Sequence, residues 1–174
     1  PSLQVSRAAR QEVTVVLNGD GGDELFGGYR RHVAVQALGR LAWVPRPLAR
    51  ALTALLPPER LSRRSKLGLI SRLSRGLSLP PEERYLVYTA DMLRESDKRP
   101  FWQAPVRASE ELVRDLIDER LPFLDQQVDL ELKLNLVSSL LVKMDMATSA
   151  YSLEGRSPLL DHRLGELALS LPSD

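Results

Sequence analysis

Residues 13–29 read VTVVLNGDGGDELFGGY, and this stretch decides the predicted fold. Its first five residues are mostly β-branched and carry no charge, which is typical of a strand buried inside a parallel sheet. No other segment predicts a convincing strand, and one strand cannot form a sheet alone. The strand is therefore either an addition to a helical domain or one piece of a larger parallel sheet whose other strands lie upstream of this chain.

The segment after the strand holds five of the ten glycines. A glycine-rich loop at the carboxyl end of a parallel strand is where open α/β sheets bind ligands. Glycine lets the backbone approach a ligand closely, so its N–H groups can hold phosphate oxygens. Asp20, Asp23 and Glu24 would repel phosphates unless a divalent cation lay between them, and Mg²⁺ commonly binds one or two carboxylates together with phosphate oxygens. The sequence therefore predicts a nucleotide and magnesium site here.

Other interpretations of this loop are weaker. A tight turn with Asp23 as a helix N-cap is the structural alternative. An EF-hand does not fit, because Gly22 would fall at a ligand position and Asp23 where the turn glycine belongs. The chain also lacks the P-loop and dinucleotide glycine patterns.

Helical patterns fill most of the remaining sequence. The expected helices include residues 33–41, 48–56, 85–93, 112–117, 125–142 and 164–168. The third is expected to begin at Pro80-Pro81, and the fourth to begin at Ser109 and stop at Pro122. The helix over 125–142 is apolar around most of its circumference and is expected to be buried. Residues 59–79 are basic, and their structure is left open.

The C-terminal block reads LLVKMDMATSAYSLEGRSPLLDH over residues 140–162. Lys143 and Asp145 follow an apolar helix, where a buried lysine is usually paired structurally. The functional alternative is a lysine that neutralises charge developing on a phosphate or oxyanion. Glu154 and Arg156 suggest an ion pair, and Asp161 suggests a helix cap.

Composition restricts the possible functions. The 174 residues carry a net charge of +1 and no cysteine, which excludes disulfides, thiolate metal sites and a cysteine nucleophile in this chain. Residues 1–80 hold 13 basic and 5 acidic side chains, and residues 81–174 hold 11 and 18. The basic stretch 60–75 is either a solvated linker or a surface for nucleic acid or another polyanion. With no bilayer-length apolar run and no secretory signal, we expect a cytoplasmic protein that does not bind membranes.

The loop and the C-terminal block together resemble the C-terminal synthetase domain of the glutamine-hydrolysing asparagine synthetase family. Members typically read L-S-G-[DE]-G-[GA]-D-E-L-F-G-G-Y where this chain has LNGDGGDELFGGY. They read close to L-L-V-K-x-D-x-x-[ST]-M-A-x-S-x-E-x-R-x-P-[FL]-L-D-H at the second block. The resemblance runs from the strand to the end of the chain, and the middle third matches only in helical character.

The resemblance implies an ATP-dependent ligase that adenylates a carboxylate and then forms an amide with ammonia released from glutamine. In the family, this carboxylate is the side chain of aspartate. It implies a fold class that is mainly α, a helical bundle with one strand belonging to a Rossmann-like sheet, and a single domain fragment over residues 1–174. The implied nucleotide-binding residues are Asn18, Gly19, Asp20, Gly21 and Gly22. The implied metal ligands are Asp23 and Glu24, with ATP and Mg²⁺ as the cofactors. The candidate catalytic residues are Lys143 and Asp20.

Departures from the family pattern limit what the resemblance carries over. Asn18 replaces the family's serine, and Ser149 stands where methionine is usual. Met146 replaces a common Arg or Lys, and Lys143, one helical turn earlier, is expected to take over that role. The family's Ser-Gly-Gly-x-Asp-Ser loop and its glutaminase domain do not occur in residues 1–174. We therefore expect little synthetase activity from this chain alone. We also expect an acceptor carboxylate that is that of aspartate or of a related acid, and self-association through the exposed strand edge.

Overall fold

The computed structural model describes residues 1–56, 65–89 and 98–172. These residues are mainly helical, as the sequence predicts, and they also contain one small parallel sheet of two strands. The chain divides into two compact units: unit 1 comprises Pro1–Tyr29 and Val128–Asp174, and unit 2 comprises Arg30–Gln127. That residues 1–174 form one domain fragment stays a prediction.

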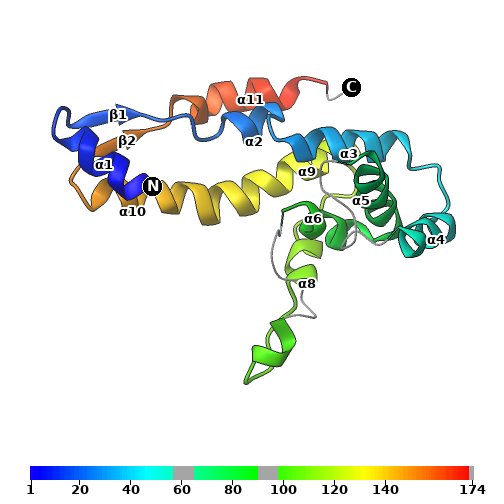
Figure 1. Ribbon diagram of the computed structural model, residues 1–174. Helices are drawn as coiled ribbons and strands as arrows, with labels where there is room; N and C mark the ends of the chain where they lie inside the picture. The colour runs from blue at the N-terminus through cyan, green and yellow to red at the C-terminus, as the bar shows by residue number, and fades with distance from the viewer. Residues whose placement is uncertain (57–64, 90–97, 173–174) are drawn as a thin grey trace. The chain divides into compact units, whose positions relative to one another are not determined.

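Unit 1 contains both sequence motifs. Its elements are α1 (Ser2–Arg10), β1 (Val15–Leu17), α2 (Gly22–Phe26), the π-helical segment η3 (Glu131–Leu140), α10 (Leu141–Ser149), β2 (Glu154–Arg156), η4 (Pro158–Leu160) and α11 (His162–Ser170). Helix α1, which the sequence analysis did not predict, packs against α10, and α2 packs against α11 and η3 (Figure 1).

The sheet of unit 1 pairs the predicted strand with one that the sequence did not reveal. β1 runs parallel to β2, with Val15 opposite Glu154 and Leu17 opposite Arg156. The expectation of a single strand is therefore wrong: β2 reads Glu-Gly-Arg and has no apolar pattern to detect. β1 is also less buried than expected within this chain, because Leu17 is 71% exposed.

The strongest predicted helix is confirmed over residues 125–142. It is made of α9 (Phe123–Leu130), η3 and α10, which follow one another without a break. The expectation that it is buried all round is wrong, because Leu130 and Leu136 are buried while Val137 and Val142 are about half exposed. Among the described residues, part of the apolar surface of this helix is therefore exposed, and an apolar circumference does not predict complete burial.

Unit 2 is a set of helices that pack against one another. They are α3 (Arg30–Arg40), α4 (Arg46–Leu55), α5 (Lys66–Ser78), α6 (Pro81–Thr89), the short turn η2 (Arg99–Phe101), α8 (Ser109–Arg114) and the first turns of α9. Helices α4 and α5 approach closely because small residues lie between them: Ala49, Ser71 and Ser74 are almost fully buried. The Thr53 hydroxyl donates to Ser74 Oγ across this contact (3.1 Å).

Arg84 stabilises the end of α5 in unit 2. Its Nε donates to the Gly76 carbonyl oxygen (2.8 Å), and one terminal nitrogen donates to that of Leu79 (3.1 Å). Its guanidinium carbon lies 4.3 Å from the centre of the Phe123 ring, a cation–π contact. Among the helices that the structure describes, none combines the length and the apolar character needed to cross a bilayer.

Candidate functional site

Asn18 connects the two motifs at the carboxyl end of β1. Its backbone N–H donates to the Arg156 carbonyl oxygen (2.9 Å) and extends the parallel sheet by one hydrogen bond. Its side-chain Oδ1 accepts from the Ser157 hydroxyl (2.6 Å) and from the Asp20 backbone N–H (3.2 Å). Residues 139 positions apart are thereby joined by one side chain.

Gly21 has a conformation that few other residues adopt. Its φ is +93°, and it is the N-cap of α2. A Cβ at this position would lie 2.1 Å from Leu160 Cδ2, so the loop backbone lies directly against η4. The alternative that Asp23 is the N-cap is wrong, because Asp23 falls inside the first turn of α2.

Glu24 is held by two hydrogen bonds in the protein. It is 2% exposed, its Oε2 accepts from the Gly21 N–H (3.1 Å), and its Oε1 accepts from the Tyr29 hydroxyl. The exposed Asp23, its neighbour, lies beside Gly28: a Cβ on Gly28 would be 2.2 Å from Asp23 Oδ1. Of the two carboxylates predicted to bind metal, Asp23 is therefore the one open to solvent.

Asp20 carries a buried acceptor with no hydrogen-bond donor in the described part of the chain. The atom is Oδ2, on a side chain that is otherwise half-buried. A buried carboxylate oxygen without a partner is unfavourable, so this atom has a physical reason to meet a cation or a donor from a ligand. Beside it, Gly19 faces open space, with nothing within 4 Å of where its Cβ would lie.

A cavity of about 400 Å³ opens next to Asn18. Its walls come from three places in unit 1: the loop after β1, one face of α10, and β2 with the residue that follows it. The lining residues are Asn18, Leu141, Met144, Asp145, Thr148, Ser149, Leu153, Glu154, Gly155 and Ser157. Asp145 was named from the sequence, but not as a residue of this cavity. The shared helix face of residues 141, 144, 145 and 148 was the available signal.

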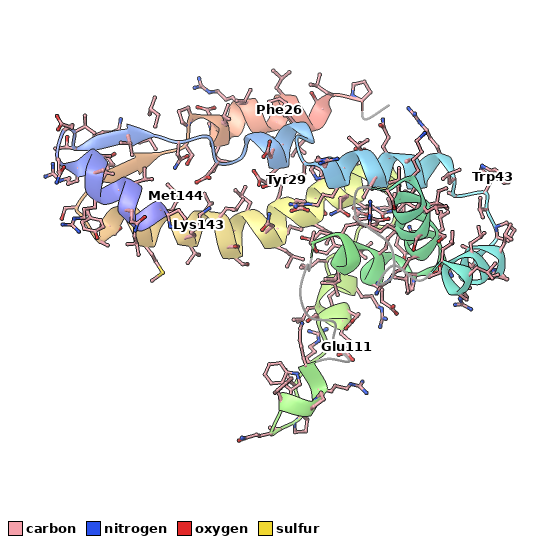
Figure 2. All side chains as sticks on the ribbon, viewed as in Figure 1. Phe26, Tyr29, Trp43, Glu111, Lys143 and Met144 are labelled. Carbon is pink, nitrogen blue, oxygen red and sulfur yellow. The ribbon has the colours of Figure 1, made fainter. Side chains whose placement is uncertain are left out.

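Lys143 does not line this cavity. It is exposed, and its position on α10 is about half a turn from Asp145, whose Oδ1 instead accepts from the Ser149 hydroxyl (3.5 Å). The expectation of a buried Lys143 is therefore wrong. Met146 is 68% exposed. Figure 2 labels Lys143 and Met144 on α10.

Two smaller predictions for the C-terminal block are confirmed. Arg156 Nε donates to Glu154 Oε1 (2.8 Å), an exposed ion pair. Asp161 is the N-cap of α11 and accepts from the Arg163 backbone N–H (3.0 Å). The Arg163 guanidinium, hydrogen-bonded to the same carboxylate, lowers the pKa of Asp161.

Of the two residues predicted to hold Mg²⁺, Asp23 fits a cation that is shared with a phosphate, whereas Glu24 already accepts two hydrogen bonds within the protein. In the described ranges, no three His, Asp or Glu side chains cluster as a ready-made metal cage. The loop offers carboxylates, one of them exposed at Asp23 and one with an unpartnered oxygen at Asp20. Mg²⁺ typically binds in this way, through one or two carboxylates plus substrate phosphates and water.

Part of the basic stretch takes part in interactions within the protein. Residues 57–64 lie outside the residues that the structure describes. Arg72 and Arg75, on α5, are half-buried and take part in interactions within the protein. The stretch is therefore at least partly engaged in the packing of unit 2.

Comparison with known proteins agrees with the resemblance of the two motifs. The asparagine synthase family model matches residues 1–174. A protein of Mycobacterium bovis named "putative asparagine synthetase (glutamine-hydrolyzing)" is 37% identical over 99% of this chain and 26% of its own length. Asparagine synthetase (glutamine-hydrolyzing) 1 of Bacillus subtilis is 31% identical over 100% of this chain and 27% of its own length.

The chain thus spans about a quarter of the length of these curated relatives. No solved structure gives a significant match to it.

Proposed function

Because the chain belongs to the asparagine synthase family, we propose that it supplies part of the site at which an ATP-dependent ligase forms an amide C–N bond. The proposed reaction is the activation of a side-chain carboxylate, that of aspartate or a related acid, followed by attack of ammonia. The carboxylate oxygen bonds to the α-phosphorus of ATP and pyrophosphate leaves. The nitrogen of ammonia then bonds to the acyl carbon, AMP leaves, and a proton is released.

The observation that carries this proposal is the meeting of the two motifs. The loop after β1 and the block after α10 are joined by the Asn18–Ser157 hydrogen bond and by the β1–β2 pairing. They share the cavity of about 400 Å³. A pocket with a few convergent polar groups at the carboxyl end of a parallel strand is the expected place for a nucleotide and its acceptor.

In this proposal the backbone from Asn18 to Gly22 lies along the nucleotide. The open space at Gly19 would accept it, and the buried Asp20 Oδ2 would gain the partner that it lacks. Asp23 would hold Mg²⁺, with Glu24 adjacent to it. When bound, the cation neutralises charge that develops on the departing pyrophosphate.

Asp20 and Lys143 remain the proposed catalytic residues. Asp20 lies next to Asn18 in the loop, and its Oδ2 could accept a hydrogen bond from the reacting nitrogen. Lys143 lies outside the cavity, so it could act only on a part of the pyrophosphate that extends past α10. We propose that Lys143 supplies a positive charge at that edge, in place of the Arg or Lys side chain that many family members have at the position of Met146.

The rest of the enzyme is proposed from the family. The ammonia would come from glutamine in a glutaminase domain, and β1 would lie in a larger Rossmann-like sheet, for which its exposed Leu17 supplies an uncovered apolar surface. The family's Ser-Gly-Gly-x-Asp-Ser loop is not in residues 1–174. We therefore propose that this chain by itself has little or no synthetase activity.

The test uses the protein as its gene encodes it. Pyrophosphate and AMP formation would be measured with ATP, aspartate and ammonia while the Mg²⁺ concentration is varied. The variant Asp23→Asn should raise the Mg²⁺ concentration needed for half-maximal rate about tenfold or more, since a ligand charge is lost. The matched control Asp129→Asn removes a half-buried carboxylate that forms an ion pair with Lys133 (2.6 Å), away from the loop after β1, and should leave that concentration unchanged.

Two results would contradict the proposal. One is the absence of ATP-dependent pyrophosphate release with aspartate, or a related acid in its place, and ammonia. The other is an Asp23→Asn protein whose Mg²⁺ dependence equals that of the Asp129→Asn control.

A further inference from the structure

A chain of two hydrogen bonds runs from Tyr29 to the loop after β1. The Tyr29 hydroxyl donates to Glu24 Oε1, and Glu24 Oε2 accepts from the Gly21 N–H (3.1 Å). Glu24 lies at the third position of α2 and Gly21 at its N-cap, which is the carboxylate half of a capping box. Tyr29 lies just after α2, where Figure 2 labels it.

Both ends of this chain matter for the shape of the loop. Gly21 has φ +93° and lies against the Leu160 side chain, so a small movement of its backbone changes the contact with η4. Glu24 is 2% exposed, and a buried carboxylate keeps its position only while its oxygens have donors. The Tyr29 hydroxyl provides one of those donors.

We propose that Tyr29 is a positioning residue for the nucleotide loop, acting through Glu24 on the backbone of Gly21. Glu24 then serves as an acceptor for two donors of the protein, and Asp23 is left as the metal ligand of the pair. The catalytic part of this inference rests on the proposed function. The part that concerns the backbone of Gly21 does not, because it can be measured without substrate.

The first experiment uses Tyr29→Phe, with Tyr151→Phe as the matched control. Tyr151 also lies in unit 1, just after α10, and its hydroxyl forms no hydrogen bond within the part of the chain that the structure describes. Hydrogen exchange of the Gly21 amide would be followed in the protein as its gene encodes it, without ligand. Tyr29→Phe should speed this exchange about tenfold, whereas Tyr151→Phe should leave it unchanged.

The kinetic readout separates positioning from general damage to the fold. Tyr29→Phe should raise the KM for ATP about tenfold and change kcat less. The reason is that a smaller fraction of the molecules has the loop in the conformation that binds ATP. A protein that is merely less stable would lose active molecules, which lowers the apparent kcat and leaves KM unchanged.

A second variant, Glu24→Gln, distinguishes a positioning acceptor from a metal ligand. Glutamine can accept from the Gly21 N–H through its oxygen while its amide nitrogen donates to the Tyr29 oxygen, so the geometry can survive without the charge. We expect slow Gly21 exchange to be retained and the Mg²⁺ dependence to change less than twofold.

The outcomes can be told apart. Unchanged Gly21 exchange in Tyr29→Phe overturns the positioning role whatever the activity, and so does a large shift in Mg²⁺ dependence in Glu24→Gln. Faster exchange in Tyr29→Phe supports the positioning role even if the wild-type protein shows no ATP-dependent ligation. That last result would remove the proposed function alone.

Discussion

Neither Gly21 in unit 1 nor Gly76 in unit 2 has room for a side chain, but the close contact serves a different purpose at each position. Gly21 combines a left-handed backbone, φ +93°, with a close approach to Leu160. Gly76 lies in the ordinary helix α5, and a Cβ there would be 2.6 Å from the Tyr88 oxygen and 2.9 Å from Leu38 Cδ1. The first glycine shapes a loop, and the second allows helices to pack.

The same difference appears in the range of the contacts. In unit 1, Asn18 bonds to a residue 139 positions away. In unit 2, the hydrogen bonds from Thr53 to Ser74 and from Tyr88 to the Arg72 carbonyl span 21 and 16 positions. Unit 1 brings distant polar groups to one cavity, whereas unit 2 is stabilised by neighbouring helices. Substitutions in unit 1 should therefore affect ligands first, and those in unit 2 should affect stability first.

The largest expected effect is that of Gly21→Ala. The left-handed backbone disfavours a Cβ, and the collision with Leu160 adds overpacking. Together these should destabilise the protein by about 3 kcal/mol and reduce ATP-dependent activity at least a hundredfold. Thermal unfolding and pyrophosphate release measure the two effects.

Gly19→Ala is the matched control for stability. No atom lies within 4 Å of its Cβ position, so we expect a change of less than about 0.5 kcal/mol in the free energy of unfolding. Equal destabilisation by the two alanines would mean that the contact with η4 does not fix the shape of the loop.

Alkaline pH should reveal the packing of unit 2. Burial raises the pKa of Tyr88 to about 12 from 10.0, against the lowering effect of nearby arginines. A phenol with a raised pKa in the folded state contributes its full stability below pH 10 and loses it as the pH rises towards 12. This should lower the free energy of unfolding of the wild type by about 2 kcal/mol over that range.

Tyr88→Phe has no proton to lose, although it also lacks the hydrogen bond to the Arg72 carbonyl. Its free energy of unfolding, measured by denaturant titration between pH 9 and 12, should fall less steeply than that of the wild type. Parallel curves would mean that the Tyr88 hydroxyl is not protected by packing in unit 2.

Part of this organisation could be predicted from the sequence, because helices and the strand β1 have local patterns. The spacing of apolar residues predicted α3, α4, α8 and α11, with ends that differ by a few residues, and it predicted α6, whose expected continuation to residue 93 lies outside the described residues. β2 could not be predicted, because its Glu-Gly-Arg sequence has no strand pattern and becomes a strand only by pairing with β1. α1 was also missed, and η3 shows that an apolar pattern does not reveal a π-helical segment.

Gly76→Ala should change the stability of unit 2 by less, because two contributions to the free energy of unfolding oppose each other. Alanine favours a helix over glycine by about 1 kcal/mol, but here its Cβ would displace the Tyr88 hydroxyl and Leu38. We expect a net loss of about 1–2 kcal/mol in the free energy of unfolding and an unchanged KM for ATP. A raised KM with normal stability would show that the packing of unit 2 contributes to ligand binding.

The sequence predicted most of the residues of the candidate site, but it did not predict how their side chains are arranged. The loop from Asn18 to Glu24 was named from its glycines and acids, and the structure brings it to the C-terminal block. The burial of Glu24 and the exposure of Lys143 could not be foreseen, because each depends on which face of a helix meets its neighbours. Ser157 was missed as a site residue since its partner Asn18 is far away in the sequence.

The smallest effect tests the link between the motifs directly. Asn18→Ala and Ser157→Ala each remove one partner of the 2.6 Å hydrogen bond and should each destabilise the protein by about 1 kcal/mol. Because they share one interaction, the double variant should be less destabilised than the sum, with a coupling of about 1 kcal/mol in a double-mutant cycle. Denaturant titration of the four proteins measures it. Additive effects would mean that the two motifs are neighbours without being linked through Asn18, and the contrast between long-range bonding in unit 1 and local packing in unit 2 would then rest on the β1–β2 pairing alone.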